Sequence, residues 1–224
     1  MKYKVITFDA YSALLDIKGS LVPALEKVFD VSGKDLTAVF AMWRTRQWDY
    51  VLLSSSMNKG FLSYRYITRC ALDYTLLKFD LTCSEANREE LVDAWSHLSA
   101  WPEAQTTLLE IKRRGYPIAI LSNGDEAMLK SLEGSTGIVF DYIFCAEQAK
   151  AYKPSPKIYQ LPFDKLGLAR AEVLHVAGSP FDMMGAKAEG LLCIWSNRFH
   201  DFPIDPIYKP DFECNDLSGL LKVL

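Results

Sequence analysis

The stretch Val5-Ile6-Thr7-Phe8-Asp9-Ala10-Tyr11 decides the fold class of this chain. Residues 5–8 form a short apolar run that is typical of a buried strand, and the run ends abruptly at a carboxylate. Three later apolar runs also end in small or polar residues; they cover 117–121, 173–177 and 191–195. Strand runs that alternate with helical patterns predict an α/β fold with a mainly parallel sheet. Since ligands of such sheets bind at the carboxyl ends of the strands, the residues after these runs are candidates for a site.

A long segment after the first strand interrupts this alternation. Residues 18–98 contain no convincing strand run and show only helical periodicity. One helix face there is predicted to carry Ala38, Val39, Met42, Trp43 and Arg46. We interpret 18–98 as an all-helical cap over the sheet edge, inserted into a core made of residues 1–17 and 99–224.

Composition narrows the class of protein. The 25 basic and 28 acidic side chains give a net charge of −3, which argues against a nucleic-acid partner. Neither a signal peptide nor an apolar stretch of transmembrane length is found, so we expect a soluble cytoplasmic protein with no membrane partner. The five cysteines form no CxxC pair and are expected to be buried, reduced thiols.

Polar residues at four places follow the predicted strands or lie in the loops near them. An aspartate at a strand end, such as Asp9, is by itself more often a turn former than a catalytic residue. Ser122 and Asn123, however, offer donors to an anion, Lys153 adds an ammonium beside a proline, and Asp182 opens a later helix. Together these positions predict a site with two carboxylates and one ammonium.

These residues resemble the motifs of a known superfamily. The segments Phe8-Asp9-Ala10-Tyr11, Leu121-Ser122-Asn123-Gly124, Tyr152-Lys153-Pro154 and Phe181-Asp182 are similar to the four motifs of the haloacid dehalogenase superfamily, and the likeness spans essentially the whole chain. Within it, Asp9-Ala10-Tyr11 and Trp43-Arg44-Thr45-Arg46-Gln47 most resemble the L-2-haloacid dehalogenases. The resemblance implies a Rossmann-like core with a helical cap, an ester intermediate on Asp9, and a homodimer.

Position 11 separates two activities within that superfamily. Its phosphatases carry a second aspartate two residues after the nucleophile, which protonates the departing alkoxide. Tyr11 cannot readily replace that acid, because an unperturbed phenol has a pKa of about 10. A halide ion is a very weak base and leaves without a proton, so the loss of the acid is harmless to a dehalogenase.

We expect neither a metal nor a cofactor. The phosphatases usually place a carboxylate at the position of Ala177, which has no ligand atom. The three histidines, at positions 97, 175 and 200, are isolated in the sequence, and His175 lies inside an apolar strand as a satisfied core residue. Asp9 and Asp182 alone would provide few oxygen ligands for Mg²⁺.

The resemblance also implies roles for individual residues. Arg44 and Asn123 would bind the leaving halide, while Ser122 and Ser179 would bind the substrate. Lys153 would keep Asp9 ionised, and Asp182 would orient or help to deprotonate the water of the second step. Tyr11, with Trp48 and Phe181, would form apolar walls, although each of these aromatic side chains alone is more commonly part of a core.

Several positions depart from the dehalogenase pattern. Ser12-Ala13 stands where Gly-Thr is common, so we expect a hydroxyl near the nucleophile to be missing. Ala177 and Ser179 replace a serine and an asparagine, and Thr45 replaces a glutamine. The sequence predicts hydrolytic dehalogenation of small 2-haloalkanoic acids to 2-hydroxy acids. A small-molecule phosphatase and a catalytically silent binding protein of the same fold are the alternatives.

Overall fold

The computed structural model describes residues 2–29, 35–57 and 59–224. The chain divides into two compact units, one of Met1–Leu15 with Ala100–Leu224 and the other of Asp16–Ser99. Within the described residues, no helix combines the length and the apolar character needed to cross a membrane.

A six-stranded parallel sheet forms the first unit, in the order β3-β2-β1-β4-β5-β6. Its strands are β1 (Val5–Phe8), β2 (Ile118–Ser122), β3 (Tyr142–Cys145), β4 (Val173–Ala177), β5 (Leu192–Ser196) and β6 (Phe212–Cys214). The α/β fold is confirmed, and the four predicted strands lie within one residue of the observed β1, β2, β4 and β5. The two edge strands were not predicted, because β3 is exposed at its start and β6 has only three residues.

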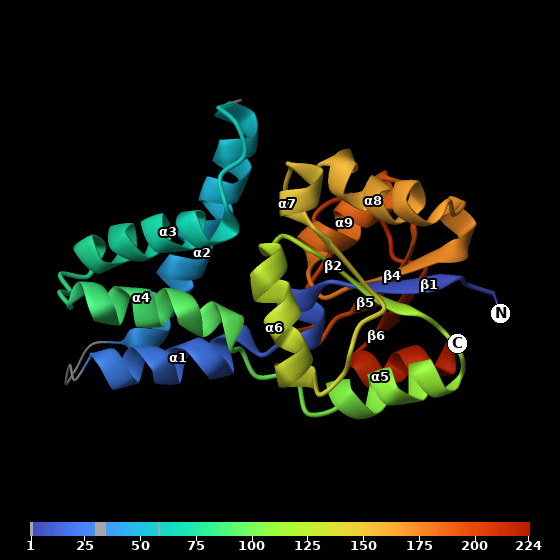
Figure 1. The fold of residues 1–224 in the computed structure, drawn as a ribbon, viewed down its shortest axis with the longest axis horizontal. Coiled ribbons are helices and arrows are strands. Elements are labelled where there is room, and N and C mark those ends of the chain that lie inside the picture. The colour runs from blue at the N-terminus through green and yellow to red at the C-terminus, as the bar shows by residue number, and fades with distance from the viewer. Residues whose placement is uncertain (1, 30–34, 58) are drawn as a thin grey trace. The chain divides into compact units, whose positions relative to one another are not determined.

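Helices cover both faces of this sheet (Figure 1). They are α5 (Ala104–Arg113), α6 (Glu126–Thr136), α7 (Ala146–Ala149), α8 (Pro156–Leu166) and α9 (Pro180–Ala188), with the 3-10 turns η3 (Arg170–Glu172) and η4 (Leu217–Lys222). In Figure 1, α8 and α9 lie on one face of the sheet, while α5 and η4 lie on the other. A proline in the first turn, as at Pro156 and Pro180, suits the start of a helix. Proline lacks a backbone N–H, and an N–H in the first turn would have no partner within the helix in any case.

The described residues of the second unit form helices joined by loops and no strand, as predicted. This unit contains α1 (Ile17–Val28), α2 (Leu36–Met57), α3 (Tyr64–Lys78), α4 (Glu85–Asp93) and the 3-10 turn η2 (Ala94–Ser96). The buried stripe of α2 includes Val39, Trp43, Gln47, Val51 and Ser54. Of the five residues predicted to share one helix face, Val39 and Trp43 are buried, and the other three are half-buried.

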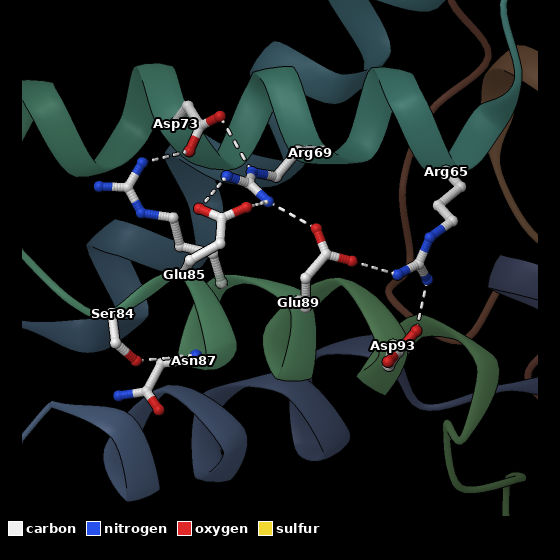
Figure 2. A network of polar contacts seen from close by, with 9 residues as sticks. Arg65, Arg69, Asp73, Ser84, Glu85, Asn87, Glu89 and Asp93 are labelled. Atoms are coloured by element: carbon white, nitrogen blue, oxygen red, sulfur yellow. Dashed lines mark hydrogen bonds and ion pairs between the residues drawn. The ribbon is translucent and has the colours of Figure 1, made fainter.

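Ion pairs join α3 to α4 in this unit (Figure 2). Arg69 donates to both oxygens of Glu85, at 2.7 and 2.8 Å, and also pairs with Glu89 at 2.5 Å. Arg65 pairs with Glu89 at 2.5 Å and with Asp93. These side chains reach solvent, so each pair adds little to stability on its own.

The cysteines only partly match the expectation. Cys145 and Cys193 are buried, and burial raises the pKa of the Cys145 thiol to about 11. Cys70, Cys83 and Cys214 are only half-buried, so the prediction of burial was wrong for these three. All five are free thiols.

Candidate active site

Three adjacent strands bring the predicted polar residues to one edge of the sheet. β1 ends at Phe8 and delivers Asp9; β2, on one side of it, ends at Ser122; β4, on the other side, ends at Ala177. Because β2 and β4 flank β1, the direction of the chain's progress across the sheet reverses here. In open α/β sheets, such a reversal opens a crevice at the carboxyl ends of the strands.

The turn after β1 holds the carboxylate of Asp9. Asp9 is 7% exposed and caps a five-residue π-helical turn, Ala10–Leu14. Its Oδ2 accepts hydrogen bonds from the backbone N–H of Ser12 at 3.0 Å and from the Ser12 hydroxyl at 2.5 Å. The expectation that a hydroxyl near Asp9 is missing was therefore wrong, because Ser12 supplies it from one residue before Ala13.

Two glycines allow the loops around Asp9 to approach closely. A Cβ at Gly178 would lie 2.2 Å from the backbone N of Ala13, so the loop after β4 can touch the turn after β1 only without a side chain there. A Cβ at Gly124 would lie 2.6 Å from the hydroxyl oxygen of Tyr11. Tyr11 is 3% exposed, and its hydroxyl thus packs against the loop that follows Asn123.

Lys153 lies between two carboxylates. Its Nζ is 3.2 Å from Asp9 Oδ1 and 2.8 Å from Asp182 Oδ1, and the residue is 3% exposed. Its backbone N–H donates to Asn123 Oδ1 at 2.7 Å, so Asn123 fixes the loop that carries the ammonium. Burial alone lowers the pKa of Lys153, but the charges of Asp182 and Asp9 outweigh burial and raise it. The ammonium is therefore charged at neutral pH.

Asp182 lies in the first turn of α9, where Ser179 is the N-cap and accepts the Asp182 backbone N–H at 3.3 Å. Its Oδ1 accepts from the Tyr159 hydroxyl at 2.8 Å as well as from Lys153, and its Oδ2 contacts His175 Nε2 at 2.8 Å. Burial alone raises the pKa of this carboxyl, but Lys153 and His175 outweigh burial and hold the pKa well below its usual range. Asp182 is thus ionised.

Two residues that hold Asp182, namely Tyr159 and His175, were not predicted from the sequence as parts of the site. Tyr159 is fully buried on α8, and burial next to Asp182 raises its pKa well above the usual value, so it stays protonated and donates. His175 is a satisfied buried residue, as predicted, but one of its two partners is Asp182. The sequence did contain a sign of this contact. Successive side chains of a strand point to opposite faces of the sheet, so His175 lies on the face opposite to Leu174 and Val176.

The structure also places the other predicted residues. Ser122 is fully buried, and its hydroxyl has no hydrogen-bond partner among the described residues. Phe181 is 45% exposed and is therefore not part of the core. In the helical unit, Arg44 Nη1 donates to Gln47 Oε1 at 2.6 Å and to the Tyr64 hydroxyl at 3.0 Å.

The charge of Arg44 lacks a carboxylate partner in the part of the chain that the structure describes. Its guanidinium lies 5.5 Å from the ring centroid of Trp95, also in the helical unit. In the same described ranges, no group of three or more His, Cys, Asp or Glu residues is arranged to hold a metal ion.

Comparison with known proteins agrees with this geometry. Residues 3–190 match the family model for haloacid dehalogenase-like hydrolases. The chain is 33% identical to haloacetate dehalogenase H-2 of Moraxella sp. (strain B), over 100% of this chain and 98% of that protein. It is 31% identical to an (S)-2-haloacid dehalogenase of Pseudomonas sp. (strain YL), over 98% of this chain and 94% of that one.

A solved structure of an L-2-haloacid dehalogenase from Xanthobacter autotrophicus, with chloropropionic acid covalently bound, is similar at a TM-score of 0.86 and 26% identity. The match covers 99% of this chain and 98% of that chain. With its sheet, its strand-end residues and its family-model match taken together, this chain belongs to the haloacid dehalogenase-like hydrolase family.

Proposed function

We propose that this protein hydrolyses small 2-haloalkanoic acids to 2-hydroxy acids through an ester on Asp9. The observation that carries the proposal is the carboxylate of Asp9, which Ser12 and Lys153 hold in place. Tyr11 stands where a phosphatase of this family needs a second aspartate. The activities named for the relatives, on haloacetate and (S)-2-haloacids, support the same substrate class.

In the first step, the Asp9 carboxylate attacks C2 of the substrate. A carbon–oxygen bond forms, the carbon–halogen bond breaks, and the halide leaves with the bonding electron pair. We assign halide binding to Arg44 and Asn123. A guanidinium without a carboxylate partner keeps its charge for an anion, and its planar set of donors suits one.

We assign the substrate carboxylate to Ser122 and Ser179, with Tyr11 as an apolar wall. A buried hydroxyl without a partner costs free energy, so the Ser122 hydroxyl is suited to donate to a bound anion. Ser179 already caps α9, and backbone N–H groups at that helix start add further donors.

In the second step, water adds to the ester carbonyl carbon of Asp9. The bond between that carbon and the ester oxygen, which Asp9 supplied in the first step, breaks; the water oxygen completes the Asp9 carboxylate, and the 2-hydroxy acid is released. One proton of the water goes to the product hydroxyl and the other to solvent. Asp182, with a pKa held below its usual range, is a weak base, so its role is to orient the water.

We propose that no metal or cofactor takes part, because the Lys153 ammonium already lies between the two carboxylates and supplies positive charge there. We further propose that residues 18–98 act as a cap on a catalytic core of residues 1–17 and 99–224. The expected state is a homodimer in the cytoplasm, and light scattering of the purified protein tests the dimer.

The test is halide release from 2-chloropropionate and monochloroacetate in the presence of EDTA. We expect turnover that EDTA leaves unchanged. A single turnover in ¹⁸O water should place the label in the Asp9 side chain, because the first product takes its hydroxyl oxygen from Asp9. Activity that EDTA removes and Mg²⁺ restores would identify a phosphatase-type site. If the protein turned over neither a haloacid nor a phosphate ester, it would be a catalytically silent binding protein of the same fold.

A further inference from the structure

A buried polar chain runs behind the site from β1 through β4 to α9. Thr7 and His175 are register partners in neighbouring strands, and both are fully buried. The Thr7 hydroxyl lies 2.9 Å from His175 Nδ1, and His175 Nε2 lies 2.8 Å from Asp182 Oδ2. A histidine inside a parallel sheet is costly to bury unless its ring nitrogens are hydrogen-bonded, and here both are.

The acceptor character of Asp182 determines which atom donates to it. The Thr7 hydroxyl has two acceptors within reach, His175 Nδ1 at 2.9 Å and the Leu174 carbonyl oxygen at 3.4 Å. The ionised carboxylate of Asp182 has no proton to donate. His175 Nε2 therefore carries a proton and donates it to Asp182 Oδ2, while Thr7 holds the other ring nitrogen.

This bond completes the hold on the Asp182 carboxylate. Lys153 and Tyr159 donate to Oδ1, whereas His175 is the donor to Oδ2. Donors on both oxygens fix the plane of a carboxylate, and donors on one leave it able to rotate. We propose that His175, backed by Thr7, is a positioning residue that fixes the plane of Asp182 for the hydrolysis of the Asp9 ester.

This inference rests on the proposed function, and it concerns the second step for an electrostatic reason. Before the reaction, Lys153 is shared between the charges of Asp9 and Asp182. Once Asp9 is esterified, it carries no charge and its hold on Lys153 weakens. The position of Asp182 then depends more on His175, at the stage when the attacking water has to be oriented.

The test compares two substitutions of His175. His175→Phe keeps a ring of similar shape without an N–H, and His175→Gln keeps a terminal N–H that can reach Asp182. For His175→Phe we expect a burst of about one halide per site, followed by ester hydrolysis roughly 10–100-fold slower, as is typical when a supporting hydrogen bond is lost. Intact mass measurement should show the acylated protein. His175→Gln should recover part of the hydrolysis rate, and Thr7→Val should show a smaller loss of the same kind.

A pH profile adds a readout that simple loss of packing does not move. The titratable groups around His175 are Asp182 on α9, Tyr159 on α8, Cys193 on β5, and Lys153 and Asp9 beyond Asp182. Without the Nε2–H donor, the pKa of Asp182 rises. The acid limb of ester hydrolysis should therefore move to higher pH in His175→Phe and only partly so in His175→Gln.

Val176→Ala is the matched control, because it removes buried volume from the same strand on its other face. If Val176→Ala gave the same burst and stall, or if His175→Phe slowed both steps equally with an unchanged pH profile, His175 would be structural only. Should His175→Phe not fold, His175→Gln and Thr7→Val carry the same comparison. Failure of the proposed function looks different, since the wild-type protein would then release no halide.

Discussion

Both units of this chain contain a network of charged and polar side chains, and the two networks differ in their exposure to water. The buried network consists of Asp9, Lys153, Tyr159, His175 and Asp182, of which none is more than 7% exposed. The surface network consists of Arg65, Arg69, Asp73, Glu85, Arg88, Glu89 and Asp93, which join α3 to α4 (Figure 2). The side chain of Glu85, for example, is 71% exposed.

The difference teaches that the number of ion pairs says little about their importance. Water screens the exposed pairs and solvates each partner when the other is removed. In the buried network, every charge depends on its partners. Transfer of an isolated charge from water into a protein interior costs several kcal/mol, which is comparable to the whole free energy of unfolding of a typical domain. A substitution there should affect chemistry and folding together.

The largest expected effect is on turnover, from Asp9→Asn. A neutral amide is a poor nucleophile, so kcat should fall about 10⁴-fold or more, as when other enzymes lose their nucleophile. Halide release measures the loss. The matched control is Asp16→Asn, an aspartate that also caps a helix but lies in the helical unit, and it should keep full activity. A burst of halide from Asp9→Asn would contradict the assignment of the nucleophile.

The next effect is on stability, from Lys153→Met. This change leaves two carboxylates buried without their shared cation, which should lower the free energy of unfolding by about 3–5 kcal/mol. Urea denaturation at neutral pH measures it. Lys112→Met is the control at an exposed ion pair, with Asp141, and should cost about 1 kcal/mol or less. Equal losses in the two variants would remove the distinction between the networks.

The pH dependence of stability follows from the directions of the pKa shifts. The pKa of Asp182 is lower in the folded protein than in the unfolded chain, where it is about 3.9. The ionised form therefore stabilises the fold above that pH, and the contribution is lost as the pH falls below about 4. Lys153 has the opposite sign: its raised pKa stabilises the fold at lower pH, and this contribution is lost at strongly alkaline pH.

Urea midpoints between neutral pH and about pH 2.5 check the acid side of this prediction. The midpoint of the wild-type protein should fall steeply below about pH 4, and that of Asp182→Asn should change less over the same range. Parallel curves for the two proteins would mean that Asp182 does not carry the acid sensitivity.

The sequence predicted the positions of the site better than its hydrogen bonds. Asp9, Ser122 and Lys153 were found because each follows an apolar run or stands beside a loop proline. Ser12 was overlooked as a donor, because the rotation of a side chain toward Asp9 depends on a π-helical turn that periodicity does not reveal. His175 lay in a correctly predicted strand, but its partner became visible only when β4 and α9 were placed together.

A smaller effect on turnover is expected from Ser12→Ala, which removes the hydroxyl donor to Asp9 Oδ2 but keeps the backbone N–H. A hydrogen bond to a charged group contributes about 1.5–3 kcal/mol, so halide release should slow by at least about tenfold. The urea midpoint should fall as well, because the same hydrogen bond contributes to the stability of the folded protein. A wild-type rate in this variant would show that the N–H and Lys153 position Asp9 without the hydroxyl.

The smallest effect is expected in the surface network, from Arg69→Met. Arg69 contacts three carboxylates, of Asp73, Glu85 and Glu89, so it is the most connected cation of that network. The carboxylates that it leaves behind are open to water, and the methionine stem keeps some of the packing of the arginine stem. The free energy of unfolding should fall by only about 1 kcal/mol, and kcat should not change.

Salt provides the decisive measurement for that variant. At about 1 M salt, screening acts over roughly 3 Å, so the difference in urea midpoint between Arg69→Met and the wild-type protein should shrink. The difference between Lys153→Met and the wild-type protein should persist at the same ionic strength, because salt does not reach the buried network. If Arg69→Met instead cost more than about 3 kcal/mol and ignored salt, Arg69 would behave as a buried charge. The contrast between the two networks would then lie in their chemistry rather than in their exposure.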